Sequence, residues 1–82
     1  MATKRFWKIT AVNEDALVAV FVALKNECIP VDYHSTNYFE KTPYISYWGA
    51  TNERVGQRLR EESNKSGWYD DKVWINLVEY RK

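Results

Sequence analysis

The sequence predicts an α+β fold of one domain, residues 1–82, in which a four-stranded antiparallel sheet carries two helices on one face. Three observations support this prediction. Apolar residues alternate with period two in four short segments, and they recur with helical spacing in two longer ones. These segments follow one another in the order β-α-β-β-α-β. Aromatic residues make up 16% of the chain, and large rings allow a small domain to bury much apolar area without disulfides.

The first strand and the first helix are predicted in residues 5–28. The segment RFWKITAV, residues 5–12, alternates as a strand does. Asn13 is a suitable N-cap, and the acidic residues that follow it would interact favourably with the helix dipole. The helix should run to about Asn26 or Cys28 and must stop by Ile29, because a residue that precedes proline disfavours the helical conformation. Its expected buried stripe consists of Leu17, Val20, Phe21, Leu24 and Cys28.

The remaining elements are predicted between residues 31 and 80. Residues 31–39 (VDYHSTNYF) and 44–49 (YISYWG) are β-rich, and a turn at 40–43 separates them. Thr51 is the expected N-cap of a second helix that runs to about Asn64. Gly56 in its interior costs about 1 kcal/mol relative to alanine. Residues 72–80 (KVWINLVEY) form the last strand.

This element order most simply forms the ferredoxin-like split βαβ sandwich. The right-handed crossover rule places the first and third strands in the centre, the fourth beside the first and the second beside the third. Since successive side chains of a strand point to opposite faces, one set should face the helices: Trp7, Ile9, Ala11, Val31, Tyr33, Ile45, Tyr47, Val73, Ile75 and Leu77. The opposite set should form an open face: Phe6, Lys8, Thr10, His34, Thr36, Tyr38, Tyr44, Ser46, Trp48, Trp74, Asn76, Val78 and Tyr80.

Six aromatic rings of Phe, Tyr and Trp fall on this open face. Exposed apolar patches of more than a few hundred Å² usually mark interaction sites, and Tyr and Trp are enriched in binding hot spots. The alternative is a solvated face, in which cross-strand ring pairs contribute from a few tenths to about 1 kcal/mol each. We therefore predict a partner-binding surface with Tyr44, Trp48 and Trp74 at its centre and Phe6, Tyr38, Tyr80 and Lys8 around it.

The predicted function is a small non-enzymatic module, of the regulator or inhibitor type, that binds a protein or self-associates through this face. A second, partly apolar stripe on the first helix also indicates protein association. That stripe consists of Val18, Val22, Lys25 and Ile29.

The alternative function is the binding of single-stranded RNA or DNA on the same face. The arrangement resembles the RNA-recognition motif in its topology and in Phe6, Lys8, Tyr44 and Trp48, and this resemblance implies that rings stack on bases. The third strand departs from the family's motif. Pro43 stands where that motif has glycine, and Ser46 stands where its second stacking ring belongs. The net charge of +1 leaves little counterion-release energy for nucleic acid.

Enzyme activity, a metal, a cofactor and a small-molecule substrate are not expected. His34 and Asp32 share a strand face and could form an acid–base pair, but the sequence places no serine or cysteine nucleophile near them. Cys28 is the only cysteine, so no internal disulfide can form. With no apolar run long enough to span a membrane, this lone cysteine indicates a cytoplasmic protein.

Overall fold

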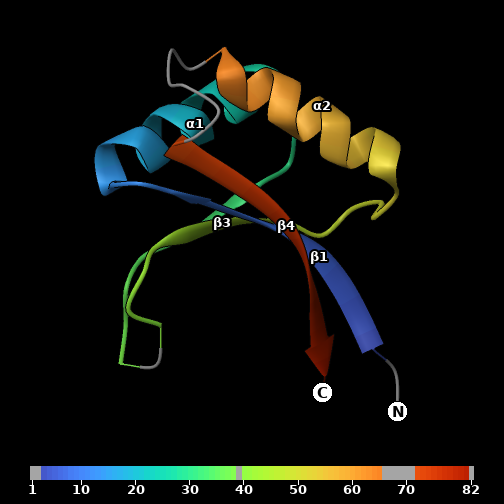
Figure 1. The fold of residues 1–82 in the computed structure, drawn as a ribbon, viewed down its shortest axis with the longest axis horizontal. Helices are drawn as coiled ribbons and strands as arrows, with labels where there is room; N and C mark the ends of the chain where they lie inside the picture. The colour runs from blue at the N-terminus through green and yellow to red at the C-terminus, as the bar shows by residue number, and fades with distance from the viewer. Residues whose placement is uncertain (1–2, 39, 66–71, 82) are drawn as a thin grey trace.

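Two helices lie together on one face of a four-stranded sheet in the computed structural model, which describes residues 3–38, 40–65 and 72–81 (Figure 1). The elements are β1 (Thr3–Ala11), α1 (Glu14–Asn26), β2 (Asp32–His34), β3 (Tyr44–Tyr47), α2 (Glu53–Asn64) and β4 (Val73–Arg81). The strand order is β2-β3-β1-β4, and each neighbouring pair is antiparallel. The predicted α+β fold is confirmed, with β1 and β3 central and β4 beside β1.

The core lies between the sheet and the helices. Its buried apolar residues are Ile9, Leu17, Val20, Leu24, Ile29, Val31, Ile45 and Leu59, and partly buried rings such as Trp7, Tyr33 and Tyr47 pack against them. These strand residues belong to the set predicted to face the helices, so the assignment of faces is correct. Leu77 is the exception, because 39% of its surface is exposed. Helix α2 leaves a hollow of about 580 Å³ that Leu77 and Ile75 line, together with Gly56 and other α2 residues.

Both helices begin at an asparagine. The Asn13 Oδ1 accepts a hydrogen bond from the Ala16 N–H (2.8 Å), which confirms the predicted cap of α1. At α2 the cap is Asn52 and not Thr51, since the Asn52 Oδ1 accepts from the Val55 N–H (3.0 Å). Side-chain capping of this kind satisfies N–H groups that have no partner within the helix.

Helix α1 ends at the first of the two predicted positions, but the predicted place of Cys28 on its buried stripe is wrong. The helix ends at Asn26, and Cys28 has a φ of 61°, which turns the chain out of the helix. The Ile29 N–H then donates to the Leu24 carbonyl (3.1 Å). Ile29 is therefore buried, whereas Cys28 is exposed. Cys28 does not belong to the core stripe, because the stripe pattern assumed two further helical residues.

Near this point Lys65, which follows α2, holds the ends of the two helices together. Its Nζ lies 3.2 Å from a carboxylate oxygen of Glu27 and donates to Glu62 as well. The hydrogen bond from Lys65 lowers the pKa of the Glu27 carboxyl.

Gly56 is required by a ring of the sheet. A Cβ at this position would lie 2.6 Å from Cη2 and 2.7 Å from Cζ2 of Trp7. Real Cβ atoms do not approach other heavy atoms so closely, so the absence of a side chain lets α2 rest on the indole. This close packing explains why glycine, despite its weak helix propensity, occupies this position in α2.

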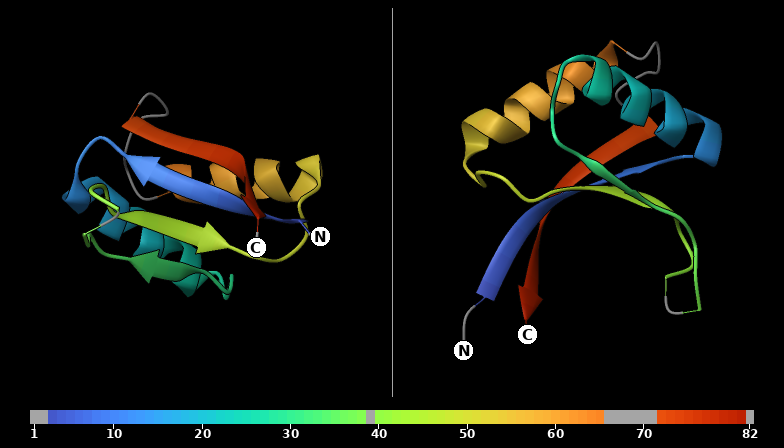
Figure 2. Two further views of the ribbon diagram at one scale, coloured as in Figure 1. Left: turned by 90° about the horizontal axis from the view of Figure 1, so that it is seen from below. Right: turned by 180° about the vertical axis from the view of Figure 1, so that it is seen from behind.

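The sheet bends away from the helices at both ends. The far ends of β1 and β4 and the connection between β2 and β3 extend below the helical layer (Figures 1 and 2). The second strand, predicted at 31–39, pairs only at Asp32–His34. It is short because Asn37 starts a turn: its Oδ1 accepts from the Glu40 N–H (2.7 Å), and its own N–H donates to the Glu40 carbonyl (2.8 Å).

Candidate binding surface

The open face of the sheet is built from cross-strand rows. One row is entirely polar and runs across all four strands: Asn76, Lys8, Ser46 and Asp32. On one side of it, Thr10 pairs with Trp74 and His34 pairs with Tyr44. On the other side Phe6 pairs with Val78. Rings therefore flank a polar centre on both sides.

Phe6 and Trp48 form one ring pair. Their centroids lie 4.3 Å apart with an interplanar angle of 23°. Only 7% of Phe6 is exposed, whereas 45% of Trp48 is exposed. Phe6 itself therefore has little exposed surface to offer to a partner. The neighbouring β3 strand brings Trp48 over it, so Phe6 supports the indole from below.

His34 and Tyr44 form the second ring pair. They stack with centroids 4.4 Å apart and planes 12° from parallel. The Lys8 Nζ lies 4.7 Å from the centre of the Tyr44 ring and 3.8 Å from the Glu40 Oε1. The positive charge of Lys8 is thus partly offset by a carboxylate and by the ring face.

Ser46 joins the two pairs. Its hydroxyl oxygen lies 2.8 Å from the His34 Nε2, and it accepts a hydrogen bond from the Trp48 Nε1 (3.2 Å). An indole N–H can only donate, so the serine proton is free to bond to an unprotonated His34 Nε2. Only 1% of Ser46 is exposed. The hydroxyl therefore fixes the orientation of one ring from each pair.

The contact between Ser46 and His34 contradicts the expectation that no serine lies near the histidine. The pairing of Asp32 with Ser46 brings the serine there. A nucleophile must reach its substrate, and the Ser46 hydroxyl is buried beneath the rings. Among the described residues, Asp32 makes no hydrogen bond to His34. The arrangement lacks the orienting third group of a nucleophilic triad.

The exposed rings lie apart from one another. Trp74, 47% exposed, and Trp48 are two strands and four residues apart, which corresponds to roughly 16 Å in sheet geometry. Tyr38 is 82% exposed and lies in the turn after β2, not on a strand, with the Lys41 Nζ 5.4 Å from its ring centre. The predicted role of the Tyr80 side chain lies outside the described residues. The surface is thus a polar row between separate aromatic sites, not one contiguous cluster.

No family model, curated protein or solved structure matches the chain. Within the described residues, neither helix has the length and apolar character needed to cross a membrane. The same residues contain no group of three or more His, Cys, Asp or Glu side chains that could hold a metal ion.

Proposed function

We propose that the protein is a small non-enzymatic binding module, of the regulator or inhibitor type, and that its open face binds a protein partner. The observation that carries the proposal is the exposure of Trp48 and Trp74, at 45% and 47%. Both lie on the sheet face opposite the helices, which no other layer of the described chain covers (Figure 2). Tryptophan is among the residues most enriched in binding hot spots.

The fixed position of Trp48 supports this role. The stack on Phe6 and the hydrogen bond to Ser46 hold the indole before any partner arrives. A side chain that is already ordered loses little entropy on association. The polar row beside it, which includes Lys8 and Asn76, offers donors and acceptors for a polypeptide.

Nucleic acid is a less suitable occupant of the same face. Phe6 is buried, and the ring of Tyr44 already contacts His34 and the Lys8 ammonium. Bases need free ring faces for stacking. Lys8 is also close to Glu40, which reduces its value to a phosphate. These contacts favour a protein partner over single-stranded RNA or DNA.

The test compares the wild type with Trp48→Ala, Trp74→Ala and the control Asn26→Ala, which changes an exposed residue at the end of α1. A protein captured by the wild type is purified and titrated against each variant by calorimetry. Loss of either indole should weaken binding by at least about 30-fold, the equivalent of 2 kcal/mol, while the control binds normally. Unchanged affinity of both tryptophan variants would refute the proposal. Binding of a single-stranded oligonucleotide that depends on Trp48 would establish the alternative function.

A further inference from the structure

The outer edge of β4 has the features of a self-pairing strand. β4 is at the edge of the sheet, and its nine residues pair with β1 in unbroken register from Ala11↔Val73 to Thr3↔Arg81. It contains no proline, glycine or bulge. Natural edge strands usually carry such interruptions, because an unpaired edge presents N–H and C=O groups to other strands. Among the described residues, no strand pairs with this edge, so it is available for pairing with another chain.

The direction of the backbone groups follows from one hydrogen bond. The Lys72 carbonyl accepts from the Val12 N–H (2.9 Å), so the backbone of Lys72 faces β1. In an antiparallel pair, alternate residues direct their backbone groups to the same neighbour. The groups that face away from β1, toward the free edge, belong to Val73, Ile75, Leu77 and Glu79.

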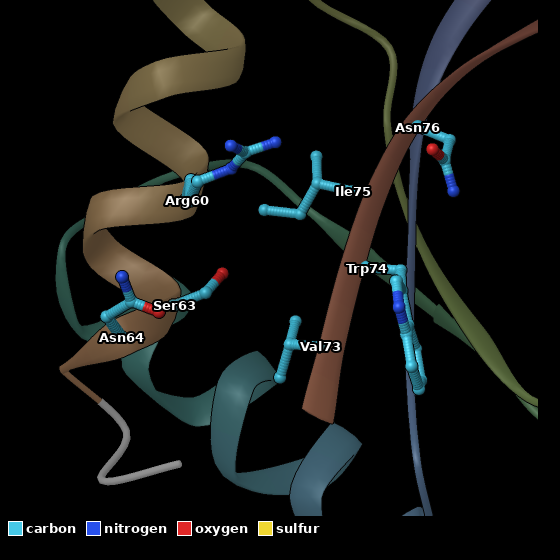
Figure 3. Close-up of a pocket in the computed structure, with 7 residues that line it drawn as sticks. All are labelled: Arg60, Ser63, Asn64, Val73, Trp74, Ile75 and Asn76. Atoms are coloured by element: carbon cyan, nitrogen blue, oxygen red, sulfur yellow. The ribbon is translucent and has the colours of Figure 1, made fainter. Parts of the chain in front are cut away.

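Apolar surface lies directly beside these backbone groups. Leu77 is 39% exposed, and Ile75 is only partly buried. The hollow of about 580 Å³ between α2 and the sheet exposes both, along with Trp7. A second hollow of about 260 Å³ lies between the end of α2 and the start of β4, where Val73 and Ile75 point toward the helix and Trp74 points to the other face (Figure 3). The helical layer thus leaves the edge incompletely covered.

We propose that β4 pairs antiparallel with β4 of a second copy of this chain and forms one continuous eight-stranded sheet. A two-fold axis perpendicular to the sheet at Asn76 places Ile75 opposite Leu77 on the helix side. It places Trp74 opposite Val78 on the open side and Asn76 opposite itself, where the two amides can exchange hydrogen bonds. The contact is isologous, so the pair is closed and does not grow into a fibre.

Charge also fits a second copy. The α2 wall of the larger hollow carries residues of both signs, Glu53, Arg60 and Glu61, and the whole chain has a net charge of +1. A two-fold axis places this wall of one copy near the same wall of the other copy. Acidic side chains of one copy can then pair with basic side chains of the other. A register centred on Leu77 would instead set Ile75 against Glu79, so the centre at Asn76 is preferred.

The size of the contact predicts a reversible dimer. In the register centred on Asn76, the seven residues Val73–Glu79 of each copy pair with one another, which gives an edge about 24 Å long, and a sheet with one helical layer is about 20 Å thick. The contact area is therefore about 500 Å² per copy, below the roughly 800 Å² of a standard interface. Both open faces would lie on the same side of the joined sheet. The proposal does not depend on what binds that face.

The test measures amide hydrogen exchange in β4 by NMR, together with sedimentation, from about 10 μM to about 1 mM protein, a range that brackets weak association. The Trp74 and Asn76 amides face β1 and should be protected at every concentration. The Ile75 and Leu77 amides should become protected only as the dimer forms. A monomer at the highest concentration, with rapid exchange at Ile75 and Leu77, overturns the proposal. A dimer in which these two amides still exchange rapidly pairs by another surface and overturns it equally.

A variant pair adds a second readout. Leu77→Lys puts a charge at the partly exposed edge and should weaken dimerisation at least tenfold, whereas Asn26→Lys at the end of α1 should dimerise as the wild type does. Trp48→Ala should leave the dimer intact, so failure of this proposal and failure of the proposed open-face function give different results. If Leu77→Lys does not fold, the wild-type exchange pattern still decides.

Discussion

The contact between Gly56 and Trp7 makes Gly56→Ala a test of how α2 rests on the sheet. In an unobstructed helix, alanine is more favourable than glycine by about 1 kcal/mol. Here the new methyl group would lie 2.6 Å from the indole, and overpacking of a core costs about 1–3 kcal/mol. The indole is a rigid ring system packed against the core, so the whole ring would have to shift to make room for the methyl group. The net expectation is destabilisation by up to about 2 kcal/mol.

Urea unfolding followed by far-UV circular dichroism measures this change. Trp7→Phe supplies the control background, because the smaller ring leaves room for the methyl group. On that background Gly56→Ala should be neutral or stabilising, and the two substitutions should therefore be non-additive. If Gly56→Ala alone, in the otherwise wild-type protein, raises the free energy of unfolding by about 1 kcal/mol, the prediction is refuted. The helix would then not rest on Trp7.

Three further substitutions test the assignment of layers and the hydrogen bonds of Ser46. Ile45→Ala removes a residue with no exposed surface and should lower the free energy of unfolding by about 2–5 kcal/mol, while Leu77→Ala should cost about 1 kcal/mol or less because Leu77 is already partly in water; equal losses in urea unfolding would show that Leu77 is a core residue. Ser46→Ala should cost about 1–3 kcal/mol, since Trp48 and His34 lose their common partner. An unchanged Trp48 indole N–H resonance in that variant would show that the hydrogen bond does not form.

The strand order and the faces could be predicted because they depend on local and general rules. Alternation in RFWKITAV and KVWINLVEY assigns each side chain to a face, and handedness fixes which strands are central. How deeply a side chain is buried on its face depends instead on the elements that pack over it. Leu77 has the correct parity, yet it is exposed because α2 stands away from β4 there. Phe6 has the parity of the open face, yet Trp48 buries it. Both outcomes depend on the placement of neighbouring elements, which periodicity does not contain.

The position of Ser46 illustrates the same limit in the candidate site. Sequence alternation places Ser46 on the same sheet face as His34, and this shared face is the only feature of the sequence that indicates their contact. Its contact with the histidine depends on the register between β2 and β3, in which Asp32 pairs with Ser46 and His34 with Tyr44. The turn at Asn37 and the short pairing of β2 set that register. The sequence predicted a strand of nine residues at 31–39, and a strand of that length does not show which of its residues pair with β3.

Small residues explain why this chain can hold so many rings. Gly56 makes room for Trp7, and a Cβ at Gly49 would overlap the ring of Tyr47. On the open face the buried Ser46 hydroxyl lies beneath Trp48. Among the described residues, rings such as Phe6, Trp7 and Tyr47 thus contribute to packing within the chain. Trp74 is different: among the described residues it stacks on no ring, and it is 47% exposed on an edge strand. Its indole therefore has less support from other rings than that of Trp48, which stacks on Phe6.

Trp74 also lies where the two proposals meet. A protein bound to the open face would contact it, and pairing of β4 with a second copy would set it against Val78 of that copy. Loss of Trp74 is therefore expected to weaken both associations and cannot tell them apart. Trp48 is two strands further from the free edge, and its support by Phe6 and Ser46 is independent of β4 pairing. Trp48 is for that reason the residue that separates partner binding from self-association.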